Sequence, residues 1–359
     1  MRKKSRLALL LAGVMAFSAF AGGCGKKEEA EATTLAVTEA SMIDSVPDMS
    51  FENHDGEVLC DLTGEWVDEK FKNKRPLAMM INNVPDAIPQ YGISKADIIY
   101  EIQVEGGVTR LMAVFHDWSG IDKLMSIRSA RHYFVYMAHY LDAIYGHYGW
   151  SPFAESAIPN LGVPNLNGLT NLGGVMYFRD PDRPSPHDVY TNSELIDEGI
   201  EIDGYDLNHR SDYEKPFAWN AADTPLAGGK PAKKVTTRMS GFTTPWFEYN
   251  EKDQTYYRFQ YGEPHMDAGA NEQLHYKNVI CIYADTLVLD AEVGWLDVLF
   301  EHGGNGYYIT DGAYVPITYS YVDGTIKYFT EDGNQLKMNP GKTFISVLDA
   351  ADQSAVTFE

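Results

Sequence analysis

"ADIIYEIQVEGGVTRLMAVFHDW" (residues 96–118) decides the fold of this chain. It contains two runs rich in aliphatic, β-branched and aromatic residues, 96–104 and 109–118, and the four residues EGGV separate them. Glycines between two such runs are typical of the turn of a β-hairpin. The stretch therefore predicts two paired strands near the start of a folded domain.

Further strands and helices on both sides of this hairpin predict a first domain. Three more apolar runs indicate strands: "RPLAMMINNV" (75–84), "KLMSI" (123–127) and "DAIYGHYG" (142–149). We expect an aromatic-rich helix from about Ser129, and a short helix with a serine cap at "SELIDEGIEI" (193–202). Residues 151–192 are rich in Pro, Gly and Asn and are expected to be irregular. Strand pairs mixed with helices predict an α/β domain with a mixed sheet over residues 75–220.

The rest of the chain predicts a second, smaller domain that consists mostly of strands. Short alternating runs with many aromatic residues recur between DG and NG turns over residues 233–350. The predicted fold class is therefore α+β, with an N-terminal mixed α/β domain followed by a mostly-β C-terminal domain. A chain of 359 residues is long enough for two such cores.

The first 24 residues indicate where the protein resides. A basic start is followed by an apolar run, Leu7–Ala21, and then by "FAGGCG", which contains Cys24. Small residues directly before a cysteine are typical of a bacterial lipoprotein signal peptide, which is cut before that cysteine and leaves it lipidated. We expect the chain to be anchored through Cys24 on the extracytoplasmic face of the cell membrane, because two or more acyl chains bind stably. The alternative is an ordinary secretory signal with a stray cysteine.

The composition excludes one class of partner and predicts a spacer. The chain has 29 basic and 51 acidic residues, a formal charge of −22, so nucleic acid would be repelled. Residues 25–74 are polar, small and acidic, and they predict a disordered tether between the lipid and the fold.

The sequence contains no motif for a cofactor and no recognisable spacing of metal ligands. Its glycine turns fit neither a phosphate loop nor a dinucleotide fingerprint, and the histidines show no metal-binding motif. We therefore predict no cofactor and no metal. Two further cysteines, Cys60 and Cys281, are far apart in sequence, and whether they form a disulfide stays open at this point.

Several segments, in order, resemble one known family. They are "RPLAMMINN", "ADIIYEIQVEGGVTRLMAVF", "SIRSARHYF", "GHYGWSPFA", "YFRDPDRPSPHDVYTN" and the tail from "GYYITDGAYVPITYSYVDG" onward. The chain resembles the YerB-type lipoproteins of Gram-positive bacteria, whose N- and C-terminal parts are both classed as domain of unknown function 3048. The resemblance implies an architecture and a location at the cell envelope, and it implies no catalytic residues.

Arginine usage is the strongest chemical signal in the first domain. Between residues 96 and 212 the only lysine is Lys123, whereas six arginines occur there: Arg110, Arg128, Arg131, Arg179, Arg183 and Arg210. Arginine is preferred where a planar group must bind a carboxylate or phosphate in two places. If Arg128 and Arg131 lie on one face near the start of the predicted helix, they predict an anion site. The alternative is internal pairing with Glu101, Glu105, Asp180 or Asp182.

We therefore expect a binding or accessory protein of the cell envelope that recognises an anionic group. The ligand would be a wall polymer, a lipid-linked phosphate or a peptide carboxylate. Arg128, Arg131, Arg179 and Arg183 would contact it, and Glu101 and His187 would orient them. The full set of expected ligand-binding residues is Arg128, Arg131, Arg179, Arg183, Glu101, His147, Ser151, Asp180 and His187.

Two other functions remain open from the sequence. The first is a hydrolase or transferase of envelope polymers, with His147, Ser151, Glu101 and His187 as its candidates. The second is a protein-interaction module in which the tyrosine-rich C-terminal domain binds an envelope protein partner.

Overall fold

The computed structural model describes residues 54–359, which form one compact unit. The predicted signal peptide, Cys24 and the predicted tether up to residue 53 lie outside the described residues. Within the described part of the chain, the fold is mostly β, with three α-helices and with sheets that mix parallel and antiparallel strands. No helix among these residues is long and apolar enough to cross a membrane.

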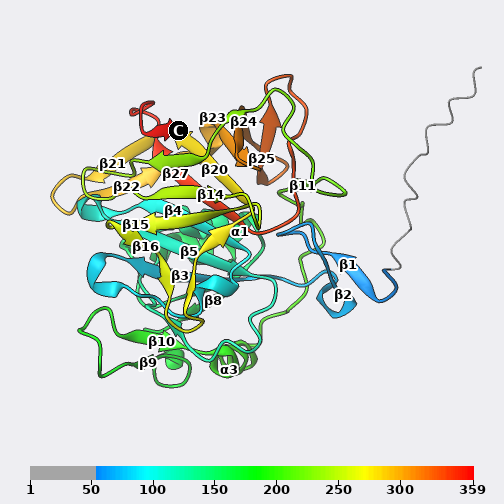
Figure 1. The fold of residues 1–359 in the computed structure, drawn as a ribbon. Coiled ribbons are helices and arrows are strands. Elements are labelled where there is room, and N and C mark those ends of the chain that lie inside the picture. The colour runs from blue at the N-terminus through cyan, green and yellow to red at the C-terminus, as the bar shows by residue number, and fades with distance from the viewer. Residues whose placement is uncertain (1–53) are drawn as a thin grey trace, which may run out of the picture. The chain divides into compact units, whose positions relative to one another are not determined.

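A central sheet of eleven strands organises the molecule (Figure 1). Its strands in spatial order are β12 (Lys230–Pro231), β24 (Ala313–Val322), β23 (Gly304–Thr310), β20 (Asn278–Ala284), β27 (Thr343–Asp349), β4 (Ile98–Gln103), β5 (Thr109–Phe115), β3 (Leu77–Asn83), β7 (Ile144–His147) and β8 (Asn165–Asn167), with β25 (Thr325–Thr330) paired to β24. The predicted hairpin is confirmed as β4 and β5, whose antiparallel register pairs Ile98 with Val114 and Gln103 with Thr109. Gly106 and Gly107 in its turn have φ of 70° and 75°, a conformation that glycine adopts without strain.

The central sheet crosses the predicted boundary between the two domains. β27 lies between β20 and β4 and pairs with both in parallel, so strands from the two ends of the chain are neighbours. β3 also pairs with β7 in parallel, whereas β5 is antiparallel to both of its neighbours, β4 and β3. One sheet thus contains strands from both predicted domains. The division into residues 75–220 and 233–350 stays a prediction.

Smaller sheets surround the central one. A six-stranded sheet consists of β16 (Glu263–Pro264), β15 (Thr255–Gln260), β14 (Trp246–Asn250), β13 (Lys234–Thr237), β28 (Val356–Phe358) and β19 (His275–Tyr276). A three-stranded sheet consists of β6 (Leu124–Met125), β10 (Val189–Thr191) and β9 (Phe178–Arg179). The two-stranded pairs are β1 (Glu57–Leu59) with β2 (Trp66–Asp68), β11 (Ala218–Trp219) with β26 (Lys337–Met338), β17 (Met266–Asp267) with β18 (Glu272–Gln273), and β21 (Thr286–Asp290) with β22 (Trp295–Val298).

The helices are short and have clear end signals. They are α1 (His132–Tyr140), α2 (Pro152–Leu161) and α3 (Ser193–Asp203), with 3-10 turns η1 (Glu69–Phe71), η2 (Pro85–Ala87), η3 (Ile93–Lys95), η4 (Glu105–Gly107), η5 (Asn171–Gly174) and η6 (Phe300–His302). The Ser151 hydroxyl caps α2 by accepting a hydrogen bond from Ala154 N, and Pro152 occupies the first position of that helix. The α3 cap is Asn192 rather than the predicted serine. Residues 151–192 are thus more regular than predicted, since α2, β8, β9 and β10 lie there.

Both faces of the central sheet are buried. Along β5, Met112 and Val114 belong to one core, together with Phe134 of α1, whereas Leu111 and Phe115 belong to the other. The second core also contains Ile196 of α3 and Phe247 and Tyr256 of the six-stranded sheet. The sheet therefore forms the middle layer, with α1 on one face and with α3 and the six-stranded sheet on the other.

The folded part begins earlier than predicted. The composition predicts a disordered tether up to residue 74, but residues 54–74 contain β1, β2 and η1. Polar composition suggested disorder, yet the loop between the two strands buries the side chains of Cys60 and Leu62 against the first core. Figure 1 shows this hairpin at the right-hand edge of the molecule.

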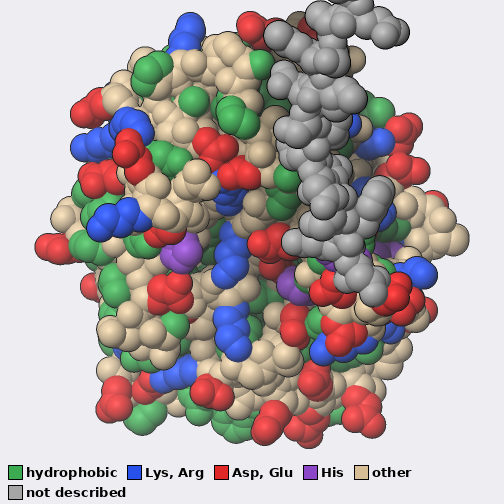
Figure 2. All heavy atoms as spheres, turned by 45° about the vertical axis from the view of Figure 1, so that its right-hand side comes forward, with side chains coloured by type: hydrophobic (Ala, Val, Ile, Leu, Met, Phe, Trp, Pro, Cys, Tyr) green, Lys and Arg blue, Asp and Glu red, His purple; other side chains and the backbone are tan. Residues whose placement is uncertain are grey.

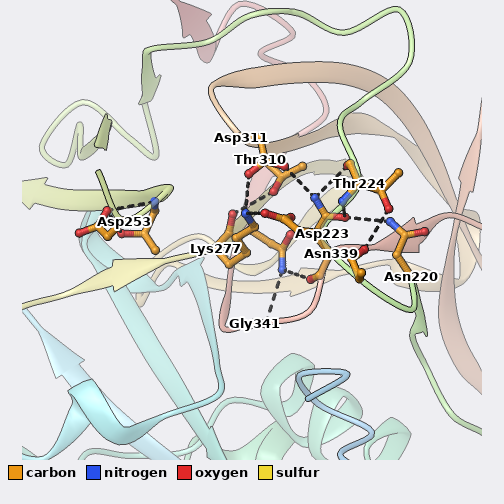
Figure 3. A network of polar contacts seen from close by, with 12 residues as sticks. Asn220, Asp223, Thr224, Asp253, Lys277, Thr310, Asp311, Asn339 and Gly341 are labelled. Atoms are coloured by element: carbon orange, nitrogen blue, oxygen red, sulfur yellow. Dashed lines mark hydrogen bonds and ion pairs between the residues drawn. The ribbon is translucent and has the colours of Figure 1, made fainter. Parts of the chain in front are cut away.

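A polar network ties the segment before β12 to the central sheet (Figure 3). Asn339 donates from Nδ2 to Asp311 Oδ2 at 2.9 Å and to Thr224 O at 3.0 Å. Its Oδ1 accepts from Asn220 Nδ2 at 2.8 Å and from Thr224 N at 2.9 Å. Lys277 forms ion pairs with Asp311 and Asp223. Because both ends of the buried Asn339 amide are satisfied, this network acts as a structural tie.

Candidate functional site

Arg128 and Arg131 lie in an extended segment that precedes α1. The prediction that they share a helix face is wrong, because the helix begins only at His132 and Arg131 has φ −127° and ψ 146°. Isolated bridges pair Ile127 with Ile81 and Ala130 with Trp150, and they hold the segment extended. Arg128 N also donates to Met80 O at 3.0 Å, which fixes the segment against β3.

Arg131 is neutralised by a carboxylate of the β4–β5 turn. Its Nε and Nη2 donate to the two oxygens of Glu105 at 2.5 and 2.7 Å, and its Nη1 donates to Ala130 O at 2.8 Å. Burial acts to raise the pKa of Glu105, but the hydrogen bonds and the charge of Arg131 outweigh it and lower that pKa. For this arginine, the alternative of internal pairing is correct.

Arg110 lies at the start of β5 and has no carboxylate of its own. The residue is only 5% exposed, and Nη1 donates to Ser129 O at 2.6 Å. Its Nε is buried and has no hydrogen-bond partner within residues 54–359. Burial lowers its pKa to about 9, and repulsion from Arg131 and Arg128 contributes in the same direction. A buried guanidinium that is not paired with a carboxylate is destabilising, so a negatively charged group beside it would stabilise it.

Arg128 completes a group that we call the arginine cluster: Arg110, Arg128 and Arg131. Within the described part of the chain, the Arg128 side chain makes no ion pair or hydrogen bond, and its Nε is buried. Burial lowers the pKa of Arg128 and repulsion from Arg131 lowers it further, whereas the charges of Glu105 and Asp188 oppose this. The cluster therefore has three cations close enough to repel one another, and Glu105 is the carboxylate that directly pairs with one of them.

Two more polar side chains lie near the cluster. The Tyr145 hydroxyl is buried, with no hydrogen-bond partner among residues 54–359. Burial raises its pKa and the charges of Arg110 and Arg131 oppose that shift, which places the hydroxyl within their electrostatic reach. His187 accepts a hydrogen bond at Nδ1 from Asn82 Nδ2 at 2.7 Å. Burial lowers the pKa of His187 and the charge of Arg128 lowers it further, whereas the charges of Asp86 and Asp188 oppose this.

The other predicted ligand-binding arginines have partners outside the arginine cluster. Arg179 is half-exposed and donates to both oxygens of Asp188 at 2.8 and 3.0 Å. Arg183 donates to the carbonyl oxygens of Ile88 and Pro89. Asp180 forms an ion pair with Lys123. The loop is thus held by one internal ion pair and by contacts to other segments, and the structure does not bring Arg179, Arg183 or Asp180 into the arginine cluster.

Glu101 has a partner other than the predicted one. It lies on β4 but pairs with Arg258 of β15 at 2.7 Å, and it accepts from Asn83 Nδ2 at 3.0 Å and from Thr109 Oγ1 at 2.7 Å. The prediction that Glu101 orients Arg128 and Arg131 is therefore wrong. Glu101 instead anchors a buried polar network between the central and six-stranded sheets.

His147 and Ser151 do not form a nucleophilic pair. His147 is fully buried, with Nδ1 at 2.8 Å from Gly149 O and Nε2 at 2.5 Å from Asn165 Oδ1. Burial lowers its pKa to about 4. The Ser151 hydroxyl caps α2, and no hydrogen bond joins these two side chains within the described chain. Their geometry fits structural roles rather than a general base and a nucleophile.

Other predicted features are also placed by the structure. Cys60 and Cys281 are both free thiols. Within residues 54–359, no group of three or more His, Cys, Asp or Glu side chains is arranged to hold a metal ion. Tyr256, Tyr308, Tyr319 and Tyr328 of the C-terminal segment are buried, so they contribute to the cores rather than to an exposed stripe.

Comparison with known proteins places the chain among relatives of similar length. The model described as "Protein of unknown function (DUF3048) N-terminal domain" matches residues 62–206, and the corresponding C-terminal domain matches residues 235–345. The relative named "Putative lipoprotein YerB" from Bacillus subtilis (strain 168) is 30% identical over 315 residues, which cover 88% of this chain and 92% of the relative. The crystal structure of the YerB protein from Bacillus subtilis has a TM-score of 0.75 and 28% identity, covering 84% of this chain and 99% of that one.

Proposed function

The chain belongs to the DUF3048 family, and we propose that it is an extracytoplasmic accessory protein that binds an anionic envelope ligand at the arginine cluster. The observation that carries the proposal is a group of buried donors without partners. These are Nε of Arg110, Nε of Arg128 and the hydroxyl of Tyr145, and no partner for them lies within residues 54–359. Buried donors are normally paired, so unpaired ones indicate a ligand that completes them.

The location in this proposal follows from the relative and from the start of the chain. The relative's name describes a lipoprotein, and this chain has small residues before Cys24 after an apolar run. We propose that Cys24 is lipidated and that the protein stays at the outer face of the membrane. The ligand would then be a component of the envelope.

The charges of the cluster favour an anion that accepts several hydrogen bonds. A cationic group that is buried without a counter-charge costs several kcal/mol, so an anion beside Arg110 and Arg128 would be stabilised. The negative net charge of the whole chain does not prevent this, because charge on the surface is uneven. Figure 2 shows Lys and Arg side chains along the middle of one face, with acidic side chains to both sides.

Phosphate chemistry fits these donors better than a single carboxylate. The oxygens of a phosphate group can accept hydrogen bonds from two guanidinium groups and from a hydroxyl at once, whereas a carboxylate has only two oxygens. Wall polymers and lipid-linked intermediates both carry phosphate esters, so the shared chemistry of the ligand is a phosphate group. His187 beside Arg128 could donate a further hydrogen bond from Nε2 while its Nδ1 accepts from Asn82.

A thermal-shift panel on the full chain tests the proposal. Inorganic phosphate, pyrophosphate, glycerol 3-phosphate and acetate would each be added at equal ionic strength. We expect the phosphate compounds to raise the melting temperature, since a ligand at 100 times its Kd stabilises by about 2.7 kcal/mol. Acetate should raise it less.

Two variants separate the cluster from the rest of the surface. Arg128→Gln should abolish the shift, whereas Arg238→Gln should leave it unchanged because Arg238 pairs with Asp352 on the exposed surface. Equal shifts in both variants would show that the anions act elsewhere, and the proposal would then be rejected.

A further inference from the structure

An apolar cavity lies at the end of the central sheet where β4 turns into β5. Its volume is about 250 Å³, and seven of its ten lining residues are apolar. The ends of β4 and β27 form one side, where Ile102 and Val347 are buried. The hairpin of β21 and β22 forms another side through Val288 and Leu296, which are opposite each other in its register. The cavity is therefore enclosed between the central sheet and this hairpin.

The cavity begins beside the arginine cluster. Ile102 of β4 is directly opposite Arg110 of β5 in the antiparallel register, so their side chains lie on the same face of the sheet. Side chains paired in this way have Cβ atoms about 4.5–5.5 Å apart. The guanidinium of Arg110, whose Nε has no hydrogen-bond partner within residues 54–359, is thus the next polar group along the sheet from the cavity.

Apolar side chains stay exposed around the entrance of the cavity. Val288, which lines it, is 58% exposed, and Phe242 is 76% exposed. Phe242 belongs to the same loop as Met239, another lining residue, and it lies over the β4–β5 turn, where a Cβ on Gly107 would be 2.9 Å from its ring. Exposed apolar groups at the entrance of an apolar cavity indicate a ligand with a hydrocarbon part.

The charges of the cavity and of the arginine cluster have opposite signs. Asp349 is the one charged side chain among the described residues that line the cavity. Asp290 and Glu292 lie at the turn between β21 and β22, where Asp290 Oδ1 accepts a hydrogen bond from Glu292 N at 2.8 Å. These carboxylates would repel a phosphate group, whereas Arg110 and Arg128 would attract it. A molecule with a phosphate and an apolar part would therefore bind in one orientation.

We infer that the ligand of the arginine cluster is a phosphate ester of a long hydrocarbon alcohol, with one hydrocarbon chain in the cavity beside Ile102. This inference rests on the proposed function and narrows the ligand from phosphate compounds in general to a lipid phosphate. The phosphate of a wall polymer carries no apolar chain that would fill the cavity. Each methylene group that is buried in the cavity should tighten binding roughly fourfold.

Calorimetric titration of the full chain with ethyl, butyl and hexyl phosphate tests the inference. These compounds share one head group, differ in chain length and stay monomeric. We expect hexyl phosphate to bind about 100-fold more tightly than ethyl phosphate, because it buries four more methylene groups. Hexan-1-ol, which lacks the phosphate, should bind far more weakly than hexyl phosphate.

The outcomes separate this inference from the proposed function. Equal dissociation constants for ethyl and hexyl phosphate would overturn the lipid assignment and leave the phosphate site standing. Absence of binding by all three esters and by pyrophosphate would reject the proposed function and this inference together. Equal binding of hexan-1-ol and hexyl phosphate would show that the cavity acts without the arginine cluster, which also contradicts the inference.

Two variants locate the hydrocarbon chain. Val288→Asn puts a neutral polar group at the entrance, and the exposure of Val288 favours retention of the fold. We expect hexyl phosphate to bind about fivefold more weakly and ethyl phosphate to bind as in the wild type. Leu59→Asn is the matched control, because Leu59 is an exposed apolar residue of β1, on the opposite side of the molecule from β21 and β22 (Figure 1). Unchanged binding of hexyl phosphate in Val288→Asn, or an equal loss for both esters, would overturn the inference.

Discussion

Glu101 and Arg258 form a fully buried ion pair that joins the central sheet to the six-stranded sheet. Arg258 Nη2 lies 2.7 Å from Glu101 Oε2, and both side chains are 0% exposed. Arg258 Nη1 also donates to His265 and to Gln260 Oε1, while the guanidinium lies 4.8 Å above the Phe344 ring. The pair therefore connects residues that are 157 positions apart in the sequence.

Removing one member of this pair should strongly destabilise the fold. Arg258→Met leaves the Glu101 carboxylate buried without its counter-charge, which costs about 3–5 kcal/mol of unfolding free energy. Chemical denaturation of the two proteins measures the difference. Arg238→Met is the matched control, because it removes an exposed ion pair with Asp352 and should cost about 1 kcal/mol or less. Similar losses in the two variants would contradict a special role for the buried pair.

Replacing Arg128 should not destabilise the fold when no ligand is present, in contrast to replacing Arg258. Because Arg128 has no partner within the described chain and is repelled by Arg131, Arg128→Gln should leave the melting temperature unchanged or raise it. Differential scanning calorimetry in a buffer without phosphate or sulfate measures this. A clear fall in melting temperature would identify Arg128 as an internal tie and would count against the anion site.

The ion pair of Glu105 with Arg131 predicts how acid changes stability. Arg131 lowers the pKa of Glu105 in the folded protein from its ordinary value of 4.5. A carboxyl whose pKa is lower in the folded state stabilises above its unfolded pKa, and this contribution is lost as the pH falls through the folded pKa. The difference in unfolding free energy between wild type and Glu105→Gln should therefore be largest near neutral pH and shrink below pH 4.5. A difference that is constant from pH 7 to pH 3 would disagree with this assignment.

Asn339 should be a stabilising residue of the C-terminal segment (Figure 3). Asn339→Ala removes four side-chain hydrogen bonds, to Asn220, Thr224 and Asp311, and each lost hydrogen bond costs about 0.5–1.5 kcal/mol. We expect a total loss of about 2–4 kcal/mol in chemical denaturation. Asn334→Ala provides the comparison, because Asn334 bonds only to groups in an exposed turn and should cost little.

Ser151 should matter for stability and not for binding. Ser151→Ala removes the cap of α2, which costs about 1 kcal/mol. Ser156→Ala, in the same helix, removes only an exposed bond to Pro152 O and should cost less. Phosphate binding should be equal in both variants, and a loss confined to Ser151→Ala would restore that residue as part of a site.

The sequence predicts local structure in this chain better than it predicts long-range pairing. The β4–β5 hairpin, β3, β7 and α3 follow from runs of apolar residues and from turn glycines, which act over a few positions. The insertion of β27 beside β4 could not be predicted, because nothing in either strand specifies a partner some 240 positions away. The sequence does not predict the structure of residues 54–74 for a related reason, since the apolar side chains of a short hairpin are few and its burial depends on the rest of the fold.

For the candidate site, too, the sequence predicts local features better than long-range contacts. The scarcity of lysine indicates Arg128 and Arg131 as candidate site residues. Their position close to Arg110 depends on the bridges that hold the segment before α1 extended. Arg110 carried a usable signal, because it lies beside the glycine turn that also contains Glu105. The contact of His116 with Asp97 could have been predicted from the hairpin register alone.

The central claim is that Arg128 binds a phosphate group, and a calorimetric titration of the full chain with pyrophosphate tests it most directly. Charge-assisted hydrogen bonds contribute about 1.5–3 kcal/mol each, so the account predicts a dissociation constant that rises roughly 10- to 100-fold in Arg128→Gln. Arg238→Gln should bind as tightly as the wild type. No binding to the wild type, or equal dissociation constants in the wild type and Arg128→Gln, would contradict the account.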